Sequence, residues 1–167
     1  MEASLRAPFI IRWPGKVPAG RVNNEIVHIV DLFTRLAHIG GAETPKDRPI
    51  DGVDQLDFFL GKQEKSNREG FVAYVSDRLH AVKWRNWKMH LYWQVNMFDP
   101  PLKLPLPKLI NLLTDLKEEH DDYLLTHHNW VAYPMNKLLN ELEESLKKYP
   151  PIPMGTPDPY HPPAQVK

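Results

Sequence analysis

The chain has 167 residues, of which 42% are hydrophobic and 25% charged, and its 21 basic and 21 acidic side chains leave no net charge. This composition is typical of a globular protein, and it gives no electrostatic reason to expect nucleic acid or an anionic membrane as a partner. Cysteine is absent, which excludes disulfides, thiolate metal ligands and a cysteine nucleophile within these residues. No apolar run is long enough to span a membrane, and the first residues do not have the pattern of a signal peptide.

The first third of the chain alternates short apolar runs with turns. Residues 7–13 form an apolar run that Pro14-Gly15 ends, a pattern that predicts a buried strand. Apolar residues at helical spacing predict a helix over 31–39, with Asp31 as its N-cap and Gly40 just past its end. A loop follows, and the polar stretch 62–70 is the expected domain boundary.

The second part predicts a small antiparallel sheet and one helix. Three runs with strand-like alternation, 71–75, 79–84 and 87–95, favour a meander. Residues 99–107 contain too many prolines for regular structure, and one more short strand is expected at 108–113. A leucine stripe from Met135 to Leu146, with Pro134 in the first turn, predicts the C-terminal helix, and the proline-rich residues after Tyr149 cannot be helical.

The chain contains short motifs at residues 2–8, 13–15, 31–35, 50–54, 60–61, 81–90 and 111–118. In this order, and over nearly the whole length of the chain, they resemble the motifs of the sulfatase family. The family's E-G-G-x-R-x-P segment and W-P-G turn correspond to residues 2–8 and 13–15, with Ala3-Ser4 in place of the paired glycines. Its D-x-F-P-T helix start corresponds to residues 31–35, with Thr34 in place of the proline. Its I-D-G-x-D segment and short L-x-G correspond to residues 50–54 and 60–61.

Two further motifs of the same family follow in the second half. The A-V-x-x-x-x-W-K-x-H strand pair corresponds to residues 81–90, and the N-L-x-x-D-P-x-E turn corresponds to residues 111–118, with Leu116 in place of the proline. The resemblance implies an α+β chain: a C-terminal remnant of an alkaline-phosphatase-like α/β domain in residues 1–65, then a small antiparallel sheet packed by a C-terminal helix in residues 66–149. Residues 150–167 would be an extended tail.

The resemblance also implies a chemistry that these residues do not supply. Enzymes of this family hydrolyse sulfate esters with a formylglycine nucleophile and a bound Ca²⁺, and whole family members are often periplasmic or secreted. Neither C-x-P-S-R nor the paired acidic metal motif is present, so no catalytic or metal-binding residue is assigned. The chain is expected to need a missing catalytic portion, in the same or a companion chain, to act on a sulfate ester. Without it, self-association through exposed apolar surface is expected.

A few polar and aromatic residues allow a functional interpretation beside a structural one. Lys88 and His90 share a face of a predicted strand, so they are candidates for substrate binding, although such strands usually belong to a core. Two further sets of residues each allow two interpretations. A metal cluster or a solvated loop could be formed by His120, Asp121, Asp122, His127 and His128. A stacking platform for sugars or bases, or packing under the helix, could be formed by Trp84, Trp87, Tyr92 and Trp93.

The leading hypothesis is therefore the C-terminal part of an arylsulfatase-like sulfuric ester hydrolase that is inactive alone. An alternative is a non-catalytic module that retains the small-domain fold and binds a partner or a glycan. A phosphoryl-transfer relative of the same superfamily is a third interpretation. The sequence does not identify the substrate, because specificity depends on the shape of the cleft.

Overall fold

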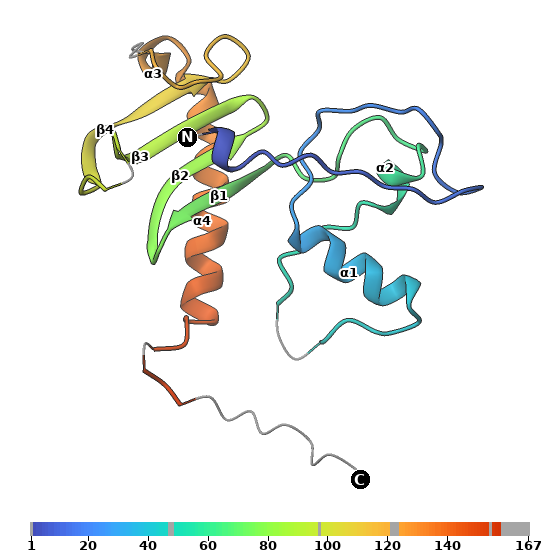
Figure 1. Ribbon diagram of the computed structural model, residues 1–167. Helices are drawn as coiled ribbons and strands as arrows, with labels where there is room; N and C mark the ends of the chain where they lie inside the picture. The colour runs from blue at the N-terminus through green and yellow to red at the C-terminus, as the bar shows by residue number, and fades with distance from the viewer. Residues whose placement is uncertain (1, 47–48, 97, 121–123, 154, 158–167) are drawn as a thin grey trace.

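The computed structural model describes residues 2–46, 49–96, 98–120, 124–153 and 155–157, in two parts that lie side by side (Figure 1). The first part consists of long irregular segments and three short elements, η1 (Glu2–Ser4), α1 (Val30–Ile39) and α2 (Leu56–Phe59). The second part consists of a four-stranded sheet, two short helices, α3 (Leu124–His127) and η2 (Asn129–Val131), and the long helix α4 (Ala132–Lys148). None of the helices in these ranges has both the length and the apolar character needed to cross a membrane.

The sheet is an antiparallel meander in the order β1-β2-β3-β4, which confirms the predicted arrangement. Its strands are β1 (Gly70–Val75), β2 (Arg78–Trp84), β3 (Trp87–Trp93) and β4 (Leu102–Asn111). Two-residue turns join the first three strands. The first residue of each turn, Ser76 and Arg85, has a positive φ, as tight hairpins of this kind require.

Strand β4 corrects the prediction that residues 99–107 lack regular structure. It begins at Leu102 and contains Pro105 and Pro107. β4 pairs only with β3, and the register between them shifts between His90 and Tyr92, so the prolines lie in an irregular section of an edge strand. Proline is tolerated there because no ladder hydrogen bond from its nitrogen is needed.

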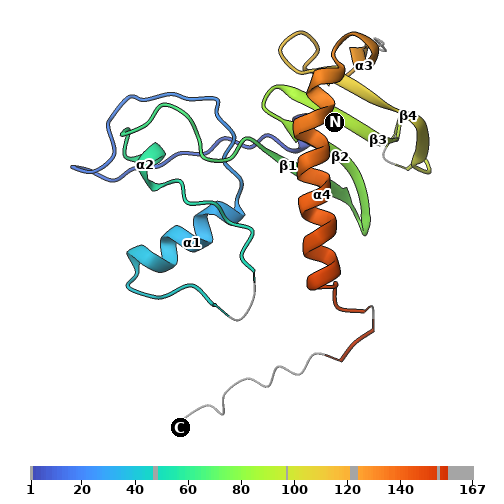
Figure 2. The ribbon, with the colours of Figure 1, turned by 180° about the vertical axis from the view of Figure 1, so that it is seen from behind.

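Helix α4 covers one face of the sheet and closes the core of the second part (Figure 2). Val82, Met89 and Leu109 of the sheet pack with Val131 and Met135, and all five are buried. At Gly70 a side chain would collide with the backbone oxygen of Lys83 and with Leu138 of the helix. Glycine at this position therefore allows the helix to approach the edge of the sheet closely.

The first part has no comparable core. Residues 7–13 form no strand, contrary to the prediction, and there is no neighbouring strand in the described structure for them to pair with. Helix α1 begins one residue earlier than expected, so Asp31 lies inside its first turn rather than at the N-cap. The helix ends with Gly41, not Gly40, in the left-handed conformation, and the amide of Ala42 bonds to the carbonyl of Ala37, as in a Schellman motif.

Candidate functional site

A buried ionic cluster centred on Glu118 lies on the face of the sheet opposite α4. Lys88 Nζ is 2.7 Å from Glu118 Oε1, and His90 Nε2 is 3.2 Å from Glu118 Oε2. Both partners come from β3, two residues apart, as expected for side chains on one face of a strand. Lys88 is only 2% exposed, so the structure places it as a buried ion-pair partner, whereas His90 also borders a cavity.

The N-terminal end of the described chain joins the same cluster. Glu2 in η1 is buried, forms an ion pair with Lys83 of β2, and has its Oε2 3.7 Å from Lys88 Nζ. Figure 1 shows η1 against the sheet on the side away from α4. Two carboxylates and two ammonium groups thus balance in charge, which buried ions require because an isolated charge is costly to remove from water.

This cluster shifts the pKa values of its members. Burial would raise the pKa of Glu118, but hydrogen bonding from His90 and Lys88 and the charge of Lys88 together lower it to about 2. Burial lowers the pKa of His90, and the nearby Lys88 lowers it further, against an opposing effect of Glu118. At neutral pH Glu118 is therefore ionised and His90 is a neutral imidazole.

Beside this cluster is a cavity of about 480 Å³. It lies where the end of β3 faces the turn that carries Glu118, and His80 of β2 and His90 form part of its wall. The side chain of His80 is 8% exposed, and its Nε2 has no hydrogen-bond partner within the described part of the chain. The remaining lining residues come from two segments, Tyr92, Trp93, Gln94 and Val95 after His90, and Leu116, Lys117, Glu118 and Glu119 of the turn.

Aromatic contacts hold both imidazoles in place. The ring of His80 stacks on Tyr92 with centroids 5.5 Å apart, and His90 meets Trp93 edge to face at 5.2 Å. Burial is the main cause that lowers the pKa of His80 as well, and the positive charge of Arg78 lowers it further. The cavity is thus lined by two neutral, oriented imidazole rings at neutral pH.

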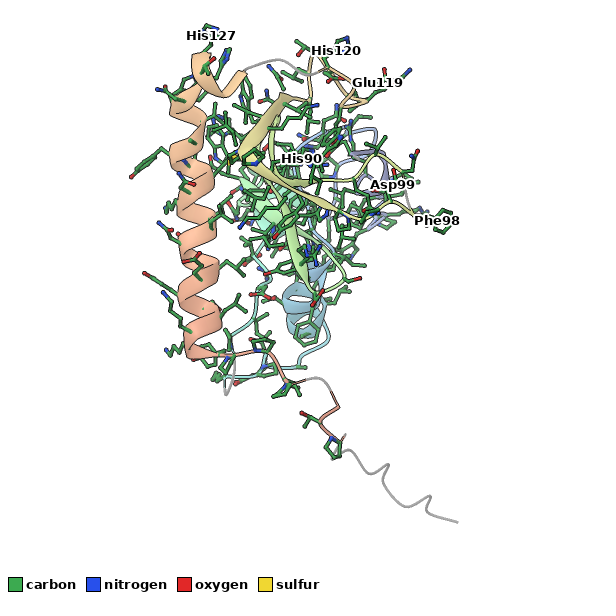
Figure 3. The ribbon with its side chains drawn as sticks, turned by 90° about the vertical axis from the view of Figure 1, so that its left-hand side faces the viewer. His90, Phe98, Asp99, Glu119, His120 and His127 are labelled. Atoms are coloured by element: carbon green, nitrogen blue, oxygen red, sulfur yellow. The ribbon has the colours of Figure 1, made fainter. Side chains whose placement is uncertain are left out.

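The proposed metal cluster in the region of residues 120–128 is divided in the structure. His120 lies near Asp115, with Nδ1 3.5 Å from Oδ1, and His127 is exposed at the end of α3. Figure 3 shows His120 and Glu119 in the turn above His90, and His127 separately, beside the N-terminal end of α4. Asp121 and Asp122 lie outside the described residues. Among the residues that are described, no group of three His, Asp or Glu side chains is arranged to hold a metal ion.

The four aromatic residues considered as a stacking platform fall into two pairs. Trp84 and Trp87 lie on the side of α4, where both meet Trp130 edge to face at 6.2 and 6.1 Å. Tyr92 and Trp93 instead line the cavity beside His90. The packing interpretation therefore fits the first pair, and the second pair remains available to a ligand.

Sequence reasoning missed the residues at the centre of this site. Glu118 ends the N-L-x-x-D turn motif and Glu2 begins the first motif, so both were visible as family positions, but nothing in the sequence connected them to Lys88. Their sequence separations of 30 and 86 residues make such pairs inaccessible to local pattern analysis. The sequence did not indicate His80 as a site residue, because a single histidine within a predicted strand is common.

A second cavity, of about 240 Å³, lies in the first part of the molecule and is apolar. It is formed by the segment around Phe9, helix α1 and helix α2. Several of its side chains remain exposed although they are large and hydrophobic: Phe9, Ile10, Ile11, Leu36 and Ile39. The first part therefore presents an exposed apolar surface.

Residues 1–145 match the family described as N-sulphoglucosamine sulphohydrolase, C-terminal. The dog N-acetylgalactosamine-6-sulfatase is 31% identical over 159 residues, which is 90% of this chain and 30% of that protein. Human arylsulfatase D is 34% identical over 99 residues, 59% of this chain and 17% of that protein. The chain thus spans less than a third of the length of these relatives.

The fold is also similar to that of solved sulfatases. The crystal structure of the PsFucS1 sulfatase from Pseudoalteromonas sp. superposes with a TM-score of 0.72 and 26% identity, over 84% of this chain and 30% of that one. A sulfatase described under the metabolism of multiple glycosaminoglycans by Bacteroides thetaiotaomicron gives a TM-score of 0.61, also at 26% identity, over 82% of this chain and 29% of that one. The chain belongs to the N-sulphoglucosamine sulphohydrolase C-terminal family and corresponds to a C-terminal portion of a sulfatase.

Proposed function

We propose that this chain forms the C-terminal scaffold and part of the substrate cleft of a sulfuric ester hydrolase, and that it does not cleave sulfate esters by itself. The proposal is supported by one combined observation: residues 1–145 match the family, and the sequence contains no cysteine. A formylglycine nucleophile is made from cysteine in the enzymes that this chain resembles, so these residues cannot provide it.

Calcium does not fit these residues either. The ion needs about six oxygen ligands from several elements, and the described residues contain no group of three side chains suited to a metal. Both Ca²⁺ and formylglycine therefore belong to the proposed whole enzyme rather than to this chain, and we assign no residue here a part in the bond cleavage. The role proposed for the chain is to position the cleft wall that contains His90.

The apolar surface around Phe9 and α1 supports an attachment to a larger domain. The related structures extend well beyond the part that superposes on this chain, and burial of exposed side chains such as Ile10 and Leu36 would stabilise an assembly by about 25 cal/mol for each Å² removed from water. The partner proposed for this surface is the portion of the sulfatase that carries the catalytic groups.

A chimera tests the proposal. The part of the Pseudoalteromonas sulfatase that superposes on this chain, 30% of its length, is replaced by this chain, and hydrolysis of that enzyme's own sulfate ester is measured with Ca²⁺ present. Activity in the chimera, with none in the truncated enzyme and none in this chain alone, is the expected result. A chimera that folds by circular dichroism but is as inactive as the truncated enzyme would contradict the scaffold role, and turnover by this chain alone would contradict its dependence on other residues.

A further inference from the structure

A proline-rich segment at the end of α4 has no part in the fold or in the proposed function. Residues 147–153, here named the proline segment, read Lys-Lys-Tyr-Pro-Pro-Ile-Pro and lie just beyond the family match of residues 1–145. Tyr149 has left the helical conformation, with φ −129° and ψ 78°, as the residue before a proline generally does. The prolines that follow favour an extended polyproline II helix.

The proline segment is exposed on the surface of the described chain. Ile152 is 81% and Tyr149 43% exposed, and Lys147, Pro150 and Pro153 are exposed as well. Figure 1 shows the chain leaving the end of α4 here and running away from the sheet. Two large apolar side chains in water, on a backbone that prolines make stiff, can be covered by a partner at a low cost in conformational entropy.

The spacing of these residues fits a polyproline II helix, which has three residues per turn. Lys147, Pro150 and Pro153 fall in one row. Tyr149 and Ile152, each directly before a proline, fall in the neighbouring row. Lys147 belongs to the last turn of α4, and because the ends of helices fray, it can join its row when the segment is bound. Two apolar residue–proline pairs behind a basic residue suit an aromatic-lined groove of the SH3 type.

The position of the basic residue sets the direction in which the proline segment would lie in such a groove. A carboxylate at one end of the groove attracts the ammonium group of Lys147 and fixes the register of the two apolar pairs. The opposite direction needs a basic residue two positions after Pro153, where this chain has Gly155.

We propose that the proline segment is the docking site for a partner domain of the SH3 type. The pairs Tyr149-Pro150 and Ile152-Pro153 each fill one aromatic-lined pocket of the partner, and Lys147 lies beside an acidic side chain at the end of its groove. This inference goes beyond the proposed function, because no residue of the segment belongs to the cleft wall. The binding is therefore measured without any sulfate ester.

The test uses an isotopically labelled SH3 domain that selects peptides with a basic residue before the two apolar residue–proline pairs. The full chain is added, and NMR follows the tryptophan indole in the groove of the SH3 domain, for which saturable shifts are expected. Pro150→Ala and Pro153→Ala should each weaken binding about tenfold or more, since each removes part of one apolar pair. Pro157→Ala, also exposed but outside the two rows, is the matched control and should leave the affinity unchanged.

Charge reversal tests the direction of binding. Lys147→Glu should weaken binding about tenfold and reduce its dependence on ionic strength. Lys148→Glu makes the same change in net charge outside both rows, and it should weaken binding by about twofold or less. All of these positions are exposed, so the variants should fold like the wild type.

Four results would overturn the inference. These are the absence of saturable shifts, an equal loss of affinity in Pro157→Ala and Pro150→Ala, an equal loss in the two lysine variants, and binding by the isolated chain but not by the folded chimera, which would show that the catalytic portion covers the segment. Binding by a folded but inactive chimera would remove the proposed hydrolase function and leave the docking site intact. An active chimera that does not bind would do the reverse.

Discussion

The two parts of the molecule use their apolar residues in opposite ways. In the second part, the sheet and α4 bury Val82, Met89 and Met135 almost completely. In the first part, large apolar side chains are left in contact with solvent, and Ile10 is 89% and Leu36 63% exposed. The second part has a core of its own between the sheet and α4, and the first part exposes large apolar side chains around Phe9 and on α1.

The largest expected effect comes from the ionic cluster that only the second part possesses. Glu118→Gln leaves the ammonium group of Lys88 buried with no full counter-charge nearer than the 3.7 Å contact to Glu2. We expect a loss of about 3–5 kcal/mol in the free energy of unfolding, as for other broken buried ion pairs. Urea denaturation followed by tryptophan fluorescence measures it, with the exposed neighbour Glu119→Gln as control. A loss no greater than that of the control would show that Glu118 is not the centre of the cluster.

Replacing one large apolar side chain by alanine in each part tests the comparison directly. Met135→Ala empties a fully buried position of α4 and should lower the free energy of unfolding by about 2–5 kcal/mol. Leu36→Ala, on the exposed face of α1, should change it by about 0.5 kcal/mol or less. In the chimera with the Pseudoalteromonas sulfatase the second change should become costly, because Leu36 would then be covered. Equal effects of the two substitutions in the isolated chain would contradict the distinction between a buried core in the second part and an exposed apolar surface in the first.

Acid should destabilise the second part in two stages. The pKa values of His80 and His90 are lowered by folding, so the unfolded chain binds protons first, and stability begins to fall as the pH drops through about 6.5. The pKa of Glu118 falls from 4.5 to about 2, so its contribution, about 3 kcal/mol, is complete above pH 4.5 and is lost between there and about pH 2. Denaturation at a series of pH values checks this. In Glu118→Gln the loss below pH 4.5 should be smaller, and an unchanged acid profile would contradict the assignment.

The sequence revealed the regular parts of the fold and missed those that depend on distant contacts. Strands β1 to β3 and helix α4 follow from alternation, from turn residues such as Arg85 and from a leucine stripe, all of which are local. The strand expected at residues 7–13 does not form, because a strand needs a neighbour that local pattern does not guarantee. Conversely, β4 forms in spite of its prolines, because pairing with β3 outweighs local propensity.

The candidate site shows the same limit. Lys88 and His90 were identifiable as neighbours on one face because strand periodicity is a local property. Their joint partner Glu118 lies in the turn that follows β4, where it adopts a positive φ, and the unsatisfied nitrogen of His80 depends on how three segments meet. No pattern within a short window of sequence encodes either feature.

The two outer strands of the sheet differ in a way that bears on how copies of this chain could associate. At one side, Pro105 and Pro107 remove amide donors from β4, so a further strand cannot dock along that section in regular register. At the other side, β1 contains no proline and, among the described residues, pairs with no strand other than β2. Strand addition can therefore join two copies through their β1 edges but cannot continue from there, so this route ends at a closed pair and does not lead to a growing fibril.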